Sequence, residues 1–215
     1  MPVASTEVLR AWYARLPDDG GSGGHPGRTL VAVLTAEFPA GTVVDLPAGR
    51  RPSGWQVAVR TDDTGRHVRS VEVAMPGAPL LWYVELPEPE PDAGPPATTL
   101  VAFSDPRCAE GTVLTEVQAG DRGVRGAGQV GAVRWWHGSG LVHQLYVAPE
   151  HRRRGVAGKL VQAAFGVQVA RGRPHLHGDG RRTDDGEAFR GGLPGYAAWR
   201  LASRTHRLPS MTPGD

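Results

Sequence analysis

The spacing of hydrophobic residues predicts two helices near the start of the chain. Apolar side chains in segment 5–16 recur every three or four residues, as on one face of a helix (Val8, Leu9, Trp12, Tyr13 and Leu16). Ser5 or Thr6 precedes them and can cap the helix N-terminus. Segment 29–38 fits either a buried strand or a second helix, and we favour the helix.

From residue 43 onward the pattern favours strands. Segments 55–60, 68–74 and 80–86 are rich in β-branched and aromatic residues, and the turn sequences DDTG and MPGAP separate them. The acidic, Pro-rich stretch PEPEPDAGPP (87–96) follows. Such a stretch is typical of a linker or of a long surface loop.

Beyond this stretch, strands are expected at 99–103, 112–117, 129–136 and 141–147. The last two form a hairpin through the turn sequence HGSG. A helix follows, because Val156, Leu160, Ala163 or Ala164, and Val167 recur at helical spacing. It is expected to end near residues 171–174.

The last third of the chain is expected to be less regular. Segment 175–179 is compatible with a short strand, and Thr183 or Asp184 can cap a further helix that runs through Glu187. The final fifteen residues show no regular pattern.

Composition narrows the class of protein. With 40% hydrophobic and 21% charged residues the chain is globular, and its 30 Gly and 19 Pro imply many turns. No apolar run approaches the roughly 20 residues that cross a bilayer, and the N-terminus has no signal-type stretch, so a cytoplasmic protein without membrane attachment is expected. A single cysteine, Cys108, excludes an internal disulfide framework and a Cys-rich metal site.

The charged residues are almost all of one basic type. Lys159 is the only lysine, the other basic residues are Arg, and Ile and Asn are absent. All three scarce types have AT-rich codons, so the bias predicts a GC-rich bacterial genome. A net charge of +2 argues against a dedicated nucleic-acid-binding protein, although the Arg run near residue 153 leaves that class open.

The segment LVHQLYVAPEHRRRGVAGKLVQAA (141–164) carries the clearest chemical signal. It places a short loop rich in Arg and Gly between a strand and the N-terminus of a helix. Unpaired backbone N–H groups, the positive end of the helix dipole and Arg side chains together suit a pyrophosphate. Gly155, Ala157 and Gly158 leave room for phosphate oxygens to approach the backbone.

These residues resemble the acyl-CoA-binding motif of the GNAT superfamily of acetyltransferases. In that family a strand of the form L-x-V-x-P runs into Gln/Arg-x-x-Gly-x-Gly/Ala, and the match here is made by six residues (Leu145, Val147, Pro149, Arg152, Gly155 and Ala157). The resemblance covers residues 113–193. It implies an α+β fold with a mixed, mainly antiparallel sheet, packed helices and an atypical N-terminal half.

The resemblance also implies a binding site. The strand would splay from its neighbour to admit the pantetheine arm, and the loop amides would hold the pyrophosphate. The residues expected to bind acetyl-CoA are Leu145, Tyr146, Val147, Arg152, Arg153, Arg154, Gly155, Val156, Ala157 and Gly158. The backbone near Tyr146 and Val147 would polarise the thioester carbonyl.

The activity implied is acetyl-CoA-dependent N-acetylation of an amine that the sequence does not identify, without a metal. The alternative is a catalytically degenerate module that binds acyl-CoA or regulates. The chain is also compatible with a homodimer. On this reading, residues 1–86 form an N-terminal α+β region, 87–97 a linker or loop, 98–205 the acetyl-CoA-binding region and 206–215 an irregular tail.

His143 is the expected general base, because some polyamine-type family members carry an acidic base at the matching strand position. Histidine is the side chain that most often acts as a general base, although a strand histidine satisfied by a neighbour is the alternative. Gln144 should point to the opposite face of a regular strand. Many family members use a Tyr on the last helix as the acid; Phe189 stands nearest to that position, and Tyr196 is the candidate that remains.

The family's usual pair of helices between the first and second strands has no counterpart in the pattern. Residues 1–86, which carry Trp12, Tyr13, Trp55 and Trp82, are therefore expected to complete the acceptor site.

Three other patterns carry less weight. The string G-x-G-x-x-G at 126–131 leads into a strand instead of opening a helix, so a dinucleotide site is not expected. His175 and His177 beside Asp179 are read as surface or structural residues and not as metal ligands. Of Trp135 and Trp136, consecutive on a strand, one should be buried and the other should face outward.

Overall fold

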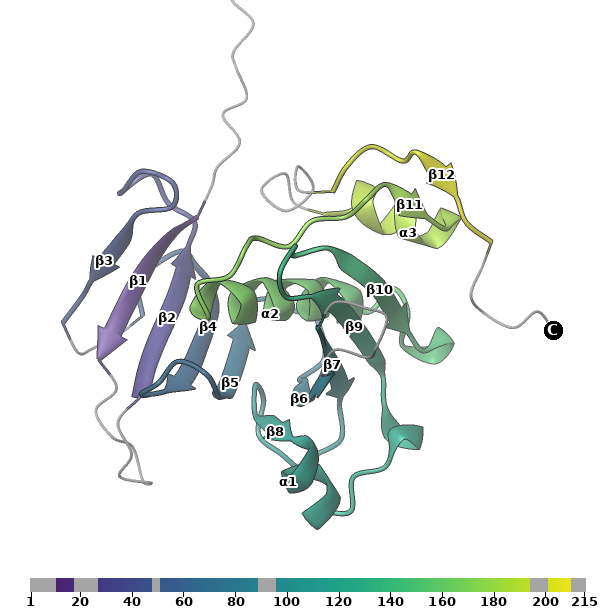
Figure 1. Ribbon diagram of the computed structural model, residues 1–215, viewed down its shortest axis with the longest axis horizontal. Coiled ribbons are helices and arrows are strands. Elements are labelled where there is room, and N and C mark those ends of the chain that lie inside the picture. The colour runs from purple at the N-terminus through teal and green to yellow at the C-terminus, as the bar shows by residue number, and fades with distance from the viewer. Residues whose placement is uncertain (1–10, 18–26, 48–50, 89–95, 194–200, 210–215) are drawn as a thin grey trace, which may run out of the picture.

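Two five-stranded sheets and one long helix dominate the computed structural model (Figure 1), which describes residues 11–17, 27–47, 51–88, 96–193 and 201–209. The first sheet has the order β3-β1-β2-β4-β5 and the second has the order β10-β9-β7-β6-β8. Strands β1 and β3, and likewise β6 and β8, are parallel, whereas the other neighbours within these sheets are antiparallel. The expected mixed, mainly antiparallel α+β fold is therefore confirmed.

The elements of the first sheet are β1 (Trp12–Pro17), β2 (Gly27–Val33), β3 (Val43–Asp45), β4 (Trp55–Asp62) and β5 (Val68–Val73). Those of the second are β6 (Trp82–Glu88), β7 (Ala97–Phe103), β8 (Val113–Thr115), β9 (Gly131–Trp136) and β10 (Val142–Val147). The helices are α1 (Glu116–Asp121), α2 (Val156–Ala170) and α3 (Asp184–Gly191), with 3-10 turns η1 (Gly126–Gly128) and η2 (Pro149–His151). A small parallel pair, β11 (Arg181–Arg182) and β12 (His206–Arg207), lies beside α3.

The two helices predicted near the N-terminus are wrong where the structure describes them. Segment 12–17 is β1 and segment 27–33 is β2; residues 1–10 lie outside the described part. Trp12, Ala14 and Leu16 alternate along β1 and pack in one core cluster with Val31 and Val33. The spacing of Trp12 and Leu16 fits a helix as well as a strand. The pairing of β1 with β2 is what makes this segment a strand.

The two sheets repeat one another in sequence and in topology. WYARLP at 12–17 returns as WYVELP at 82–87, and TLVAV at 29–33 returns as TLVAF at 99–103. Taken in chain order, each sheet pairs its first strand with its second and third, its second with its fourth, and its fourth with its fifth. The register agrees too, since Leu30 faces Val59 as Leu100 faces Val133. The two halves are thus copies of one unit, in which β5 corresponds to β10.

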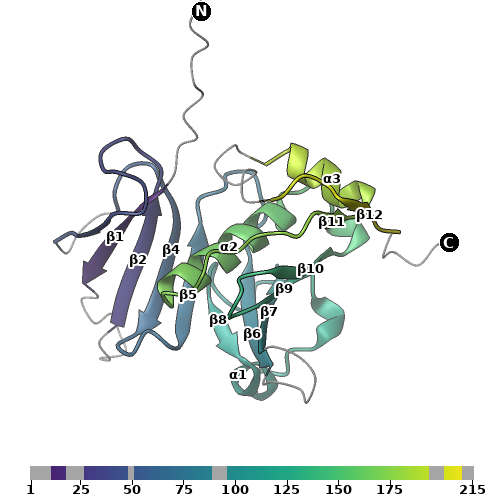
Figure 2. The same ribbon diagram turned by 45° about the horizontal axis from the view of Figure 1, so that its top comes forward.

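Helix α2 follows only the second copy, and it serves both sheets (Figure 2). It contacts β4 and β5 on one side and β7, β9 and β10 on the other. Leu160 and Val167 are at most 1% exposed within a core cluster that draws on both sheets. Burying side chains of this size stabilises a fold by about 1.5–3 kcal/mol each, so α2 joins the two copies.

The copies also meet edge to edge. Ser70 of β5 forms a bridge with Thr112, and the N–H of Val71 donates to the carbonyl of Gly111 at 2.8 Å. Gly111 has a φ of +79°, and a Cβ there would lie 2.9 Å from the Val71 carbonyl oxygen. Glycine is needed for this approach.

The Pro-rich stretch lies within a hairpin of the second sheet, because β6 and β7 on either side of it pair along their length. Residues 89–95 lie outside the described part. Segment 112–117, predicted as a strand, is the short β8 followed by α1. Thr115 caps α1 in a capping box with Gln118.

The C-terminal part corrects one further prediction. Segment 175–179 forms isolated bridges, from His177 to Leu141 and from Gly178 to Leu201, and not a strand. Thr183 caps α3, as one of the two expected residues.

Among the described residues, no helix is long and apolar enough to span a bilayer.

Candidate active site

Strand β10 has an open edge on the side away from β9. The bridge between Leu141 and His177 marks where the segment after α2 meets β10, and the Val142 N–H donates to the His177 carbonyl at 2.9 Å. Beyond Val142, no described strand pairs with this edge, which runs along residues 143–147. Among the described residues this edge is therefore open, and the splay from a neighbouring strand stays a prediction.

The direction of the backbone groups follows from the pairing with β9. The Ala148 N–H donates to the Val130 carbonyl at 3.0 Å. Because backbone groups alternate along a strand, Tyr146 also turns its N–H toward β9, whereas Leu145 and Val147 turn theirs to the open edge. The Val147 carbonyl accepts a hydrogen bond from Arg152 Nε at 3.2 Å. Leu145 and Val147 are thus the residues that offer N–H groups to a ligand beside β10.

The loop between β10 and α2 has a left-handed backbone at two of its residues. Arg153 and Gly155 have positive φ angles of 57° and 83°, and Gly155 is the N-cap of α2. The first helical bond runs from the Lys159 N–H to the Gly155 carbonyl at 3.0 Å. The N–H groups of Val156, Ala157 and Gly158 precede it and have no acceptor within the helix. Successive free N–H groups in a fifteen-residue helix attract an anion, and the side chains of Arg153 and Arg154 are exposed beside them.

Two of the small residues in this loop have an additional role. A Cβ on Gly155 would lie 2.8 Å from Ala78 Cβ, and one on Gly158 would lie 2.7 Å from Met75 Cε. Gly155 is needed for close packing against the turn that connects β5 to β6, because its φ is positive and Ala78 cannot turn aside, whereas the flexible end of Met75 lies against Gly158. Ala157, half-buried, is left as the small residue whose size bears on access to the loop.

His143 lies in a β-bulge, which changes the expected orientation of its neighbours. The register of β10 shifts between Val142 and Gln144, so His143 is the extra residue. Its ring lies 4.4 Å from the Trp136 ring, centroid to centroid, and Gln144 faces Arg134, which shares a face with Trp136. His143 and Gln144 therefore lie on one face, and the prediction that they point to opposite faces is wrong.

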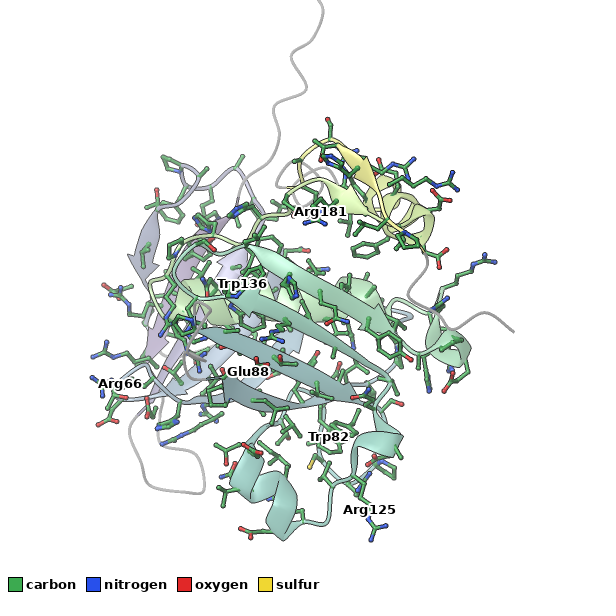
Figure 3. All side chains as sticks on the ribbon, turned by 45° about the vertical axis from the view of Figure 1, so that its right-hand side comes forward. Arg66, Trp82, Glu88, Arg125, Trp136 and Arg181 are labelled. Atoms are coloured by element: carbon green, nitrogen blue, oxygen red, sulfur yellow. The ribbon has the colours of Figure 1, made fainter. Side chains whose placement is uncertain are left out.

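That face of the second sheet is turned away from α2 and carries polar groups (Figure 3). Glu88 forms an ion pair with Arg134 and accepts a hydrogen bond from Thr99 Oγ1 at 2.9 Å. Arg134 Nε is buried without a hydrogen-bond partner among the described residues. Trp135 is fully buried and Trp136 is half-buried, which confirms the expected split between the two.

Helix α3 contacts the loop through an ion pair between Arg152 and Asp185. Arg152 Nη1 lies 3.4 Å from Asp185 Oδ2, so the motif arginine joins the end of β10 to the start of α3. Hydrogen bonds from Arg207 and Arg204 lower the pKa of the neighbouring Asp184 below its ordinary value. Phe189 is half-buried on α3, and Tyr196 lies outside the described residues.

The other patterns stay outside this site. Gly126–Gly128 forms η1 and leads toward β9, so it opens no helix that could bind a dinucleotide. The described residues contain no group of three His, Cys, Asp or Glu side chains placed to hold a metal ion. Trp12 and Trp82 are each 1% exposed in separate clusters, and so neither is available to line an acceptor site.

The internal repeat is the feature that pattern reading missed. The duplicated WY-x-x-LP and TLVA strings, read together, would have marked β1 and β2 as strands. They would also have identified β5 as the strand of the first copy that corresponds to β10. In β5 this edge is closed by a hydrogen bond to Gly111.

Comparison with curated proteins and with solved structures finds no match. A comparison with family models does find one, and it begins just before β6 and ends at the residue that bridges to the start of β10. The match therefore contains the second sheet, the Arg-rich loop and all of α2. Residues 81–177 are matched by the model of the Acetyltransferase (GNAT) family, so this segment of the chain is similar to GNAT acetyltransferases.

Proposed function

We propose that this protein is an N-acetyltransferase that moves an acetyl group from acetyl-CoA to an amine acceptor. The observation that carries the proposal is the meeting of the open β10 edge with the N-terminus of α2. The β10 edge offers backbone N–H groups, and the N-terminus of α2 offers free N–H groups with arginine side chains beside them. A ligand with amide and thioester carbonyls at one end and a pyrophosphate at the other would use both.

The first copy of the unit supports this use of the edge. Val71 of β5 corresponds to Leu145 of β10, and its N–H binds the carbonyl oxygen of Gly111 at 2.8 Å. The chain itself thus shows that an N–H at this strand position takes a carbonyl from outside the sheet. In β10 we assign that role to Leu145 and Val147, toward the carbonyls of the acyl donor.

In this mechanism the amine attacks the thioester carbonyl directly. One of the two open-edge N–H groups, that of Leu145 or that of Val147, polarises that carbonyl, and the other binds an amide carbonyl of the pantetheine arm, because N–H groups two residues apart on a strand cannot share one oxygen. The loop from Arg152 to Gly158 fixes the pyrophosphate, which positions the acyl group. His143, beside Trp136 on the open face of the sheet, accepts the proton that the amine loses, directly or through a water. The thiolate of CoA leaves, and Tyr196 is the side chain proposed to protonate it.

Phe189 favours a second candidate function. It occupies α3 without a hydroxyl group, where many members of the family carry a Tyr. A chain that binds acyl-CoA and does not turn it over would serve as a regulatory or binding module. A cytoplasmic location and a bacterial source are proposals that rest on sequence pattern and composition, a homodimer is a further proposal, and all three are common to both functions.

Titration calorimetry with acetyl-CoA, combined with a thiol-release assay over a panel of amines, tests both candidates. Saturable binding together with amine-dependent release of CoA supports the enzyme. Binding without release under any amine supports the module. Absence of acetyl-CoA binding by the folded full-length chain contradicts both.

A further inference from the structure

The loop from Arg152 to Gly158, called the donor loop below, is the proposed binding site for the pyrophosphate of the acyl donor. The N-terminal copy touches it through a tight turn. Residues 75–78 form it, with the Ala78 N–H donating to the Met75 carbonyl at 3.3 Å and a φ of +83° at Gly77. Proline is favoured at the second position of a type II turn and glycine supplies the positive φ at its third, so Pro76 and Gly77 make this turn rigid.

This turn packs against both glycines of the donor loop. A Cβ on Gly155 would meet Ala78 Cβ at 2.8 Å and Met75 Sδ at 3.8 Å. A Cβ on Gly158 would meet Met75 Cε at 2.7 Å and Sδ at 3.2 Å. One side chain, that of Met75, therefore lies against the loop at the N-cap and again in the first turn of α2.

A hydrogen bond from the buried ammonium group of Lys159 fixes the residue after the turn to the same helix. Lys159, which is 2% exposed, donates to the Pro79 carbonyl at 2.9 Å and pairs with Glu110 Oε1 at 2.6 Å. Lys159 is also the residue whose N–H makes the first helical bond to Gly155. The turn is thus attached to the helix start by an apolar contact and by a charge-assisted hydrogen bond.

The donor loop needs such support, because its conformation is strained. Arg153 holds a φ of 57°, a left-handed conformation that costs a non-glycine residue on the order of 1 kcal/mol or more and persists only where surrounding structure fixes it. If the support were removed, the loop would relax, and its N–H groups would no longer converge on one point.

We propose that Met75 is a positioning residue for the acyl donor: the turn 75–78 of the N-terminal copy braces the loop from Arg152 to Gly158 in its anion-binding conformation. This inference rests on the proposed function for its ligand. It also gives the N-terminal copy a role on the donor side of the site, where the sequence had suggested the acceptor side.

The test compares three full-length variants. Met75→Ala removes the contact, Met75→Leu keeps most of it, and Val31→Ala makes a cavity in the core cluster on the far face of the first sheet, away from α2. All three are compared with wild type by thermal unfolding, by calorimetry with acetyl-CoA, and by hydrogen exchange of the peptide that contains residues 152–160 without ligand.

We expect Met75→Ala to weaken acetyl-CoA binding at least about tenfold, the scale of effect that a displaced positioning group produces. It should raise the KM for acetyl-CoA, leave kcat with saturating donor unchanged, and speed exchange in the 152–160 peptide. Met75→Leu should restore wild-type behaviour. Val31→Ala should lose a comparable amount of thermal stability with no change in donor affinity.

Wild-type affinity in Met75→Ala would overturn the proposal, as would an equal loss in Val31→Ala. If the wild type binds no acetyl-CoA, the proposed function fails by itself. The hydrogen-exchange experiment then tests by itself whether the turn supports the loop. Unchanged hydrogen exchange of the 152–160 peptide in Met75→Ala would show that the turn does not hold the loop.

Discussion

Arg171, at the C-terminal end of α2, forms a bidentate ion pair with Glu85 of β6, with Nη1–Oε1 and Nη2–Oε2 distances of 2.5 and 2.9 Å. Both side chains are mostly buried, with 13% and 14% of their surface exposed. The same guanidinium donates from Nη2 to the Arg66 carbonyl at 2.9 Å, in the turn between β4 and β5. One residue thus ties α2 to both copies at the end opposite the donor loop.

Replacing Arg171 by Met should destabilise the fold by about 3 kcal/mol, because Glu85 would be left buried without its partner. Adding Glu85→Met should recover most of that loss, since two apolar side chains leave no unpaired charge. Urea denaturation of the single and double variants measures both effects. Arg15→Met is the matched control: its pair with Asp45 is exposed, and it should cost less than about 1 kcal/mol. Equal losses in the two single variants would contradict the assignment.

Gly166→Ala should destabilise the protein although alanine favours helices. A Cβ at Gly166 would lie 2.6 Å from Val57 Cγ1 and 2.8 Å from Val59 Cγ2, so α2 would have to move away from β4. Overpacking of this kind costs about 1–3 kcal/mol. Gly120→Ala in α1, where nothing lies within 4 Å of the new Cβ, should leave stability unchanged or raise it. Chemical denaturation of the two variants should give opposite signs, and a stabilising Gly166→Ala would show that α2 is not packed on the first sheet.

The sequence predicted the second copy better than the first, for a physical reason. In α2, Val156, Leu160 and Val167 face a large buried surface, so helical spacing was the only pattern they satisfied. In β1, the spacing of Trp12 and Leu16 is compatible both with the repeat of a helix and with the alternation of a strand. Strand pairing with β2 decided between them, and pairing is not visible in a single segment.

The order of strand, loop and helix around the proposed donor loop agrees with the prediction, because this pattern is local. Strand, loop and helix follow one another along the chain, and the Arg and Gly residues of the loop are contiguous. The support of Gly155 and Gly158 by Met75 and Ala78 could not be predicted, because it joins segments far apart in sequence. The bulge at His143 was hidden for a similar reason, since a bulge is defined by the register with β9.

Ala157→Glu should abolish acetyl-CoA binding and leave the fold largely intact. The side chain adds volume and negative charge among the free N–H groups at the start of α2, where a phosphate would lie. Calorimetry measures the affinity, and circular dichroism checks the fold. Ala127→Glu, at an exposed position in η1, adds the same charge elsewhere and should bind acetyl-CoA like wild type. Undiminished affinity in a folded Ala157→Glu variant would contradict the anion site.

Acid should destabilise the protein partly through His137. Burial lowers the pKa of His137 below its usual 6.5, and the nearby Arg173 and Arg171 charges lower it further. The neutral ring contacts the buried Thr98 hydroxyl. The unfolded chain therefore takes up a proton at a higher pH than the folded one, so stability is full above pH 6.5 and falls as the pH drops toward the folded-state pKa. Urea denaturation at pH 7.5 and 5.5 should show a larger loss for wild type than for His137→Gln, and equal losses would exclude His137 as the cause.

His143→Ala should lower the rate with saturating acceptor by about 10²-fold, the usual contribution of a positioned general base, and leave acetyl-CoA affinity unchanged. The reason is geometric: His143 stands out of the regular strand at a bulge, its ring is held against Trp136, and it lies on the same face as the polar groups of Glu88 and Arg134. His67→Ala, at an exposed position in the turn between β4 and β5, is the matched control and should retain full activity. Trp136→Leu should lower the rate less than His143→Ala, because it releases the ring without removing it. Turnover of His143→Ala near the wild-type rate from pH 6 to 9 would exclude His143 as the base and leave its contact with Trp136 as a purely structural one.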